Sequence, residues 1–196
     1  MSNREASLRE VLANNCSQIA QFLGMGQAEV ELLHKASQGV LEKSGEIVGE
    51  ILGELFRDPE SARIFQEAGL TREALESMLR GWLVSAFTGD YGEKMCLEVS
   101  KIGLTLASHG LSPTFVLAKL AAVTEVVSRH VPTNEVFPVM LKALRWNLTV
   151  VMLGYQVVRQ KIFEKATGIS EDVYNRLIKV YAKELMQELS QELGAK

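Results

Sequence analysis

Apolar residues recur at intervals of three and four positions along nearly the whole chain, and no stretch of strand length alternates between apolar and polar residues. That interval is typical of an α-helix with a buried face. The 4 prolines fall between these apolar segments or at their starts, where a residue that breaks helix interiors is tolerated. The pattern therefore predicts an all-α fold.

Turn and capping residues divide this pattern into successive helices. Glycines follow the first apolar stripe, Asp58-Pro59 opens a short helix, and Thr71 is placed to cap the next one. Glycines between positions 39 and 53 indicate a bend or a division inside the second stretch. The predicted helices cover residues 6–22, 27–56, a short segment from 59, 71–87, 93–108, 113–130, 136–163 and 170–193.

The segment between Lys101 and Lys119 has the clearest helix boundaries. One helix ends at Gly110, and a second opens at Ser112-Pro113. Glycine just past a helix end and proline in the first turn of the next helix are the expected residues. The Ser112 hydroxyl can accept a hydrogen bond from an unpaired backbone N–H of that turn. We therefore predict a tight corner between two helices.

Two late helices are apolar on more than one face, so each needs to be covered on more than one side. One explanation is that both helices cross the centre of a monomeric core. We favour the other explanation, a homodimer in which a partner chain covers them. The residues that we assign to this interface are Val116, Leu120, Val123, Val127, Val150 and Val157.

A separate amphipathic helix is predicted after Gly168. Ser170 can cap it, and the acidic residues of its first turn suit the positive end of a helix. Its apolar residues follow at steps of four, at Leu177, Tyr181, Leu185 and Leu189. We therefore expect a main domain over residues 1–166 and a packing or relay helix over residues 167–196.

Composition and charge limit the classes of partner and the cellular locations that we expect for this chain. A net charge of −3 with dispersed Lys and Arg gives no sign of nucleic-acid binding. The first residues lack the apolar core of a signal peptide, and the most apolar run, Leu148 to Val158, is too short and interrupted to span a bilayer. Cys16 and Cys96 have no paired or metal-like spacing. We expect a cytoplasmic protein with two free thiols and no membrane or nucleic-acid partner.

The residues that carry chemistry form no catalytic pattern. No histidine lies near a suitable nucleophile, and there is no glycine-rich phosphate loop or metal-spaced cluster. His34 and His130 are expected at the surface, as are most of the carboxylates. We therefore expect no enzyme.

Several short motifs, in this order, resemble the protoglobin and globin-coupled sensor family. They are Phe22-Leu23-Gly24, Phe56-Arg57-Asp58-Pro59-Glu60, Gly81-Trp82-Leu83, Phe87-Thr88-Gly89-Asp90-Tyr91, Lys101-Ile102-Gly103, Gly110-Leu111-Ser112-Pro113 and the stretch from Leu141 to Tyr155. The resemblance covers roughly residues 22–158. It implies a globin-like fold, followed here by an additional C-terminal helix.

Two positions depart from the haem-binding members of this family. In those members the haem-binding histidine stands four residues before the Gly-Leu-x-Pro, and that position is Leu106 here. A distal tyrosine is expected near Ile51-Leu52, and neither residue can donate a hydrogen bond to bound oxygen. The chain thus looks like the haem-free globin domains of stressosome sensor proteins.

The leading hypothesis is a dimeric, haem-free sensory or regulatory domain without a cofactor. It passes a signal through its late helices to an unidentified partner protein. The former haem pocket is either filled by side chains or takes an apolar small ligand such as a fatty acid. The pocket residues implied by family position and helix spacing are Leu52, Leu83, Phe87, Leu106, Phe115 and Met152.

The alternative is a haem b protein that binds oxygen or another gas with His109 as axial ligand. His109 lies three positions after Leu106, and a neutral imidazole is a good iron ligand. Its place directly before Gly110 also suits a histidine that caps helix carbonyls. A third hypothesis is an α-helical interaction protein that shares only the globin-like turns.

Overall fold

The computed structural model describes residues 7–131 and 135–194. The regular structure of these residues is α-helical, which confirms the predicted fold class. The helices are α1 (Leu8–Leu23), α2 (Gln27–Glu42), α3 (Ser44–Phe56), α4 (Pro59–Glu67), α5 (Arg72–Thr88), α6 (Glu93–Ser108), α7 (Pro113–Arg129), α8 (Val136–Thr167) and α9 (Glu171–Gly194).

Local capping residues set most of these helix ends. The Thr71 hydroxyl accepts a hydrogen bond from the backbone N–H of Ala74 at 3.2 Å, and the Ser112 hydroxyl accepts one from Phe115 at the same distance. Gly110, just past the end of α6, has a φ of 73°, a conformation that glycine adopts at little cost. The predicted corner is therefore confirmed.

The predicted division of the second stretch is also confirmed, because α2 ends at Glu42 and α3 begins at Ser44. Gly45, Gly49 and Gly53 lie in α3, and a Cβ added to any of them would meet nothing within 4 Å. The predicted start of the first helix at residue 6 lies outside the described residues.

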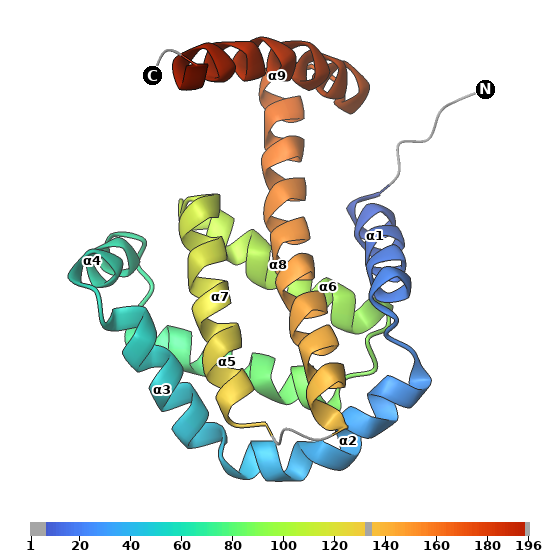
Figure 1. The fold of residues 1–196 in the computed structure, drawn as a ribbon, viewed down its shortest axis with the longest axis vertical. Coiled ribbons are helices and arrows are strands. Elements are labelled where there is room, and N and C mark those ends of the chain that lie inside the picture. The colour runs from blue at the N-terminus through green and yellow to red at the C-terminus, as the bar shows by residue number, and fades with distance from the viewer. Residues whose placement is uncertain (1–6, 132–134, 195–196) are drawn as a thin grey trace. The chain divides into compact units, whose positions relative to one another are not determined.

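Residues Met1–Gln156 form one compact unit. Within it α1 packs on α6, α2 on α5, and α3 on α4, α5 and α7. Figure 1 shows α5 and α6 crossing α7 and the first part of α8 at a steep angle. The largest fully buried side chains, which include Trp146 and Phe87, lie in this unit.

The apolar faces of the late helices are covered within one chain. Val116, Val123, Val127 and Val150 are all buried, Leu120 is half-buried, and α7 packs against α3. Val157, which belongs to the second compact unit, is buried as well. Five of the six residues that we assigned to a dimer interface are thus buried in the chain itself, so their apolar character needs no partner chain, and the dimer stays a prediction.

Helices α6 and α8 approach each other at two glycines. A Cβ added to Gly103 would lie 1.9 Å from the carbonyl oxygen of Val151, and one added to Gly154 would lie 2.1 Å from that of Ser100. Such distances are far below van der Waals contact, so only glycine fits at either position. The two backbones are thus in direct contact.

The expectation of two free thiols was also wrong. Cys16 in α1 and Cys96 in α6 form a disulfide whose Cα atoms lie 6.1 Å apart. Both side chains are buried, with 3% and 0% exposed. The two cysteines are 80 residues apart in the sequence, and only the packing of α1 on α6 brings them together.

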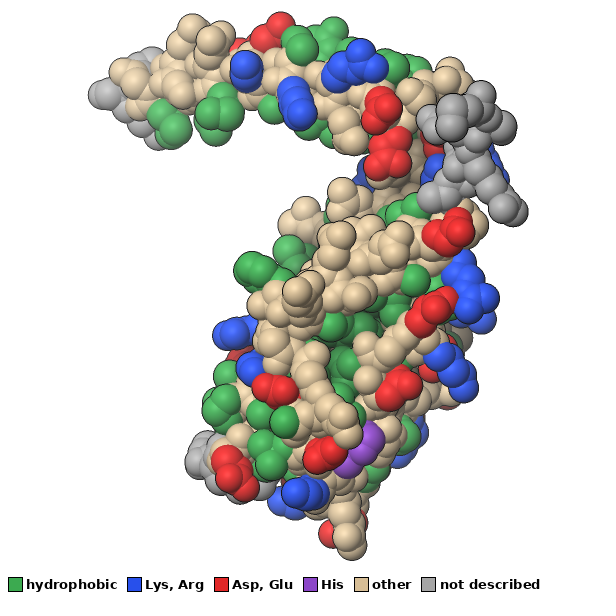
Figure 2. Space-filling model, turned by 90° about the vertical axis from the view of Figure 1, so that its right-hand side faces the viewer, with side chains coloured by type: hydrophobic (Ala, Val, Ile, Leu, Met, Phe, Trp, Pro, Cys, Tyr) green, Lys and Arg blue, Asp and Glu red, His purple; other side chains and the backbone are tan. Residues whose placement is uncertain are grey.

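Residues Val157–Lys196 form the second compact unit, and α8 is continuous between the two units. The Phe163 and Tyr174 rings pack with their centroids 5.0 Å apart. No residue of α9 is buried, and Figure 2 shows hydrophobic side chains on the surface of this helix. They include Leu177, Tyr181, Leu185 and Leu189.

Helix α8 is longer than its most apolar run. By length and composition it could cross a membrane, with a mean hydropathy of 1.4 in its most apolar window. Half of that window is buried within the fold, as it is in the core helices of soluble proteins. The helix is therefore only weak support for a membrane span.

Candidate functional site

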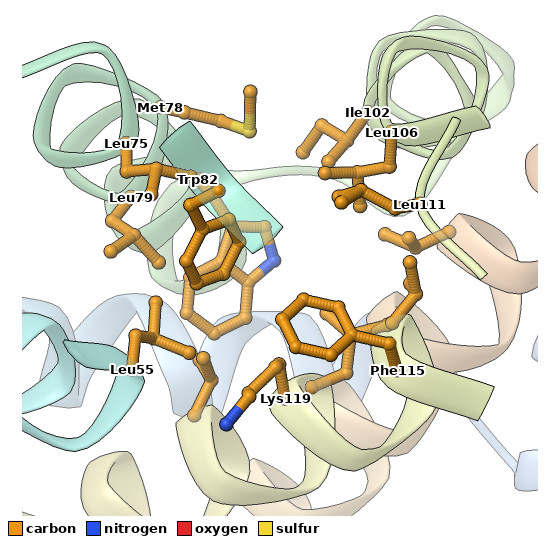
Figure 3. A pocket seen from close by; sticks show the side chains of 15 residues that line it. Leu55, Leu75, Met78, Leu79, Trp82, Ile102, Leu106, Leu111, Phe115 and Lys119 are labelled. Carbon is orange, nitrogen blue, oxygen red and sulfur yellow. The ribbon is translucent and has the colours of Figure 1, made fainter. Parts of the chain in front are cut away.

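An apolar cavity of about 80 Å³ lies in the first unit, where α5, α6 and α7 come together (Figure 3). Side chains of α3, α4 and α8 complete its walls. The lining residues are Leu55, Phe65, Leu75, Met78, Leu79, Trp82, Ile102, Leu106, Leu111, Phe115, Val116, Lys119, Leu120, Val123 and Val151.

Helix spacing explains how α5 and α6 each present a row of side chains to the cavity. On α5, Leu75, Met78 and Trp82 lie three and four residues apart, so they share one face of the helix. On α6, Ile102 and Leu106 are separated by one turn. Figure 3 shows these rows on either side of the space, with Met78 and Trp82 directed towards it.

Among the described residues that line the cavity, only Lys119 carries a charge. Its ammonium lies 5.3 Å from the centroid of the Phe115 ring and 3.9 Å from the Asp58 carboxylate. The Asp58 carboxylate accepts hydrogen bonds from the Ser61 hydroxyl and from backbone N–H groups, and these bonds lower its pKa. The charge of Lys119 also lowers this pKa. The cationic charge at the cavity is thus partly balanced by a neighbouring carboxylate.

A buried hydrogen bond fixes Trp82 in the wall. Its indole N–H donates to the side-chain oxygen of Asn147 at 3.1 Å, and the Asn147 amide donates to the Ala143 carbonyl at 2.9 Å. Asn147 is fully buried, so its polar atoms need these partners. The aromatic face of Trp82 therefore lies against the cavity while its polar edge is satisfied elsewhere.

The structure brings together two of the six pocket residues expected from the sequence. Leu106 and Phe115 line the cavity. Leu52, Leu83 and Phe87 are buried and Met152 is half-buried, and these four lie outside the cavity lining. Their part in ligand binding stays a prediction, but the geometry places them in the surrounding core.

Most of the cavity residues of α3, α5 and α6 were not identified from the sequence. Leu75, Leu79 and Trp82 belong to the apolar stripe of their helix, and Ile102 stands one turn before Leu106. A step of four residues from Leu106 would have found Ile102. Leu55 lies one turn after the expected position near Ile51-Leu52, because α3 faces the cavity only towards its end.

His109 points away from the cavity. It caps the end of α6, and its Nδ1 is hydrogen-bonded to the carbonyl oxygen of Ala68, at the end of α4. Because a carbonyl only accepts, this nitrogen carries the proton. His109 instead lines a separate surface hollow at the corner between α6 and α7.

The other two histidines differ in exposure. His34 is exposed, as expected, and its Nε2 lies 3.1 Å from the Gly89 carbonyl oxygen. The His130 side chain is only 13% exposed and lies 2.7 Å from the Glu50 carboxylate, so its expected surface position was wrong. That contact is also the largest cause of the lowered pKa of Glu50.

The comparison with known families agrees with this geometry. A family model described as Protoglobin matches residues 12–164, which is most of the chain. The chain belongs to the Protoglobin family. No curated protein matches it significantly. The family resemblance carried by the sequence motifs is therefore confirmed, and with it the globin-like fold.

The cavity of this protoglobin-family chain does not fit haem. A cavity of about 150 Å³ holds one benzene ring, so about 80 Å³ cannot hold a macrocycle of four pyrrole rings. The described lining residues include no histidine, cysteine or tyrosine, the usual proximal iron ligands. Met78 offers a thioether sulfur, but Leu106 stands at the position of the family's proximal histidine.

Proposed function

We propose that this domain is a haem-free sensor that binds an apolar small ligand in the position of the family's haem pocket. The observation that carries the proposal is the buried side chain of Leu106, which lines an apolar cavity at the position of the iron ligand. A cavity of about 80 Å³ costs about 2 kcal/mol at 24 cal/mol per Å³. Occupation by an apolar ligand would recover part of that cost.

We propose that the domain binds its ligand and does not catalyse a reaction on it. General acid–base catalysis requires a titratable group held near a reacting atom. Lys119, the charged residue of the described cavity wall, is already placed beside Asp58. We therefore propose a binding domain rather than an enzyme, and no cofactor.

Signal transmission would use α7 and α8, which both contribute to the cavity, and of which α8 leads into the second unit. Phe115 and Val116 of α7 and Val151 of α8 are all lining residues. Helix α8 continues without interruption into the second unit. A shift of either helix on ligand binding could therefore be read by a partner protein at α9, whose apolar residues are exposed.

A homodimer is part of the proposal, through a different surface from the one expected. Leu117, Ala118 and Ala121 are exposed on the outward side of α7, and a partner chain could cover them. Sedimentation of the wild type and of Leu117→Arg tests this: dissociation of a wild-type dimer by the substitution is expected. A monomeric wild type would contradict dimerisation.

Ligand binding can be followed at Trp82, whose indole N–H is hydrogen-bonded beside the cavity. We expect dissolved propane, which is small enough for a cavity of about 80 Å³, to shift the NMR signal of this group in a saturable manner. Leu79→Phe adds volume at the cavity and should abolish the shift. Val84→Phe on the exposed side of the same helix is the matched control and should preserve it.

The outcomes separate the proposal from non-specific partitioning of propane. No saturable shift in the wild type would contradict ligand binding, as would equal shifts in the wild type and Leu79→Phe. A shift confined to Trp82, with α7 and α8 unchanged, would support binding but contradict the proposed transmission route.

A further inference from the structure

The apolar cavity has a polar neighbour. A surface hollow of about 320 Å³ lies at the corner between α6 and α7 and against the end of α4. Leu111 and Phe115 line both this hollow and the cavity. The two spaces therefore lie on opposite sides of the same two side chains.

Phe115 is the less buried of the two side chains in this partition, since Leu111 is only 3% exposed. Phe115 lies in the first turn of α7, is only half-buried, and packs edge-on against Phe65 with ring centroids 5.3 Å apart. Figure 3 shows its ring directed towards Trp82 and into the space that the lining side chains surround. Rotation of this one side chain would join the hollow to the cavity.

The hollow offers a hydrogen-bond acceptor in His109. Its Nδ1–H donates to the Ala68 carbonyl, so the remaining nitrogen of the neutral ring, Nε2, is an acceptor. Among the residues that the structure describes, Nε2 has no hydrogen-bond partner. A ligand group that donates a hydrogen bond would satisfy it.

The charges around the hollow disfavour an anionic group. The Glu67 carboxylate lines the hollow and forms an ion pair with Arg63. At the start of α7, Pro113 has no N–H and the N–H of Phe115 already donates to the Ser112 hydroxyl, so neither backbone group can bind an anion. A neutral hydroxyl therefore suits this place better than a carboxylate.

We infer that the cavity and the hollow are two compartments of one binding site, which takes a short aliphatic alcohol. The alkyl chain enters the cavity past Phe115, and the hydroxyl donates to Nε2 of His109. This inference rests on the proposed function, since it assumes that the cavity is occupied by an apolar group. It adds the chemical class of the ligand and the route by which it enters.

The experiment compares 1-propanol, propanoate and dissolved propane on the full chain, with the Trp82 indole signal as readout. Propanol is expected to bind about 3- to 10-fold more tightly than propane, the gain from one hydrogen bond. Propanoate is expected to bind more weakly than propanol. Equal or tighter binding of propanoate would overturn the inference.

Variants assign the hydroxyl contact. His109→Leu should remove the preference for propanol over propane, whereas His109→Gln, which keeps both a donor and an acceptor, should retain part of it. His34→Leu, at an exposed histidine that lines neither space, is the control and should leave the preference unchanged. A preference that survives His109→Leu, or that His34→Leu removes, would overturn the assignment.

The partition has its own test, and the two proposals fail differently. Phe115→Ala should strengthen binding of 1-pentanol relative to 1-propanol, because it joins the compartments; an unchanged ratio in a folded variant would overturn the entry route. If propane binds but propanol gains nothing, this inference fails and the proposed function stands. If none of the three compounds binds, the proposed function itself fails.

Discussion

Helices α5 and α6 form two walls of the same cavity, but they are held in place in different ways. The α6 helix is joined to α1 by the disulfide of Cys96, touches the backbone of α8 at Gly103, and is bonded to α4 through His109. The α5 helix faces the cavity with Met78, Leu79 and Trp82, which are all half-buried.

This difference suggests which wall can adapt to a ligand. Backbone contacts and a disulfide leave little freedom, whereas a methionine has several rotatable bonds and fills irregular spaces. In the haem-binding members of the family, the helix equivalent to α6 carries the iron ligand. Here that helix is the more firmly attached wall, so adjustment to a ligand is expected at α5 and at Phe115.

The largest effect is expected at the disulfide. A cross-link closing a loop of 80 residues stabilises a fold by about 4 kcal/mol in the chain-entropy description. The double variant Cys16→Ser with Cys96→Ser should therefore lose about that much free energy of unfolding in urea. Wild-type protein reduced with a dithiol is the control and should behave alike. A loss below about 1 kcal/mol would contradict the importance of this attachment.

The redox state of Cys16 and Cys96 also tests the cellular compartment of the protein. Disulfides are rare in cytosolic proteins, where thiols are kept reduced. The cytoplasmic location expected from the sequence predicts that both thiols are labelled when cells are lysed in an alkylating reagent and the protein is denatured, whereas the disulfide of the structure predicts that both are protected. Complete protection of Cys16 and Cys96 would argue for an oxidising compartment.

The next effect is expected at the backbone contact between α6 and α8. Gly154→Ala places a Cβ 2.1 Å from the Ser100 carbonyl oxygen, and the helices can relieve this overlap only by separating. We expect a loss of about 3 kcal/mol, at the upper end for overpacking, measured by thermal unfolding. Gly49→Ala, where the added Cβ meets nothing within 4 Å, should instead stabilise α3 by about 0.5–1 kcal/mol.

Smaller effects are expected in the α5 wall. Trp82→Phe leaves the buried oxygen of Asn147 without the indole donor, at a cost of about 1–3 kcal/mol. Leu79→Met keeps the side-chain volume and should cost less than about 1.5 kcal/mol. Urea unfolding measures both. A large loss from Leu79→Met would show that α5 is as rigid as α6.

The smallest effect concerns the turn between the two walls. Burial raises the pKa of Tyr91, whose hydroxyl donates to the Ala86 carbonyl at 2.6 Å. The folded state therefore favours the neutral phenol. The resulting contribution of Tyr91 to the free energy of unfolding is fully present below the unfolded pKa of about 10. It should fall as pH rises further, by about 1.4 kcal/mol at one unit above.

Tyr91→Phe isolates this contribution. The variant loses one hydrogen bond at every pH, about 1 kcal/mol, and its free energy of unfolding should decline less steeply than that of the wild type at alkaline pH. Parallel curves for the two proteins would contradict a raised pKa of Tyr91 in the folded state.

Local signals made the helices predictable. Thr71, Ser112 and Gly110 mark helix ends by chemistry that acts within a few residues. The residues that line the cavity were harder to predict from the sequence, because the face that each helix turns inward depends on how the helices cross. Leu106 and Phe115 were found next to the corner, while Leu83 and Phe87 share a helix with Trp82 but lie in the core.

Long-range pairings were beyond the sequence pattern. The spacing of Cys16 and Cys96 carries no sign of their pairing, which depends on the docking of α1 on α6. The apolar positions of α7 were recognised correctly, but periodicity does not distinguish a partner chain from neighbouring helices. Val116 and Val123 are buried in the same chain, where α7 packs against α3.

Titration of the purified protein with haem, followed by visible absorption, tests the central claim most directly. The account predicts no sharp haem band that saturates at one haem per chain, and only weak binding that is the same in His109→Ala and Met78→Leu. A stoichiometric band that either substitution abolishes would contradict it and would identify a haem-binding globin with a displaced ligand.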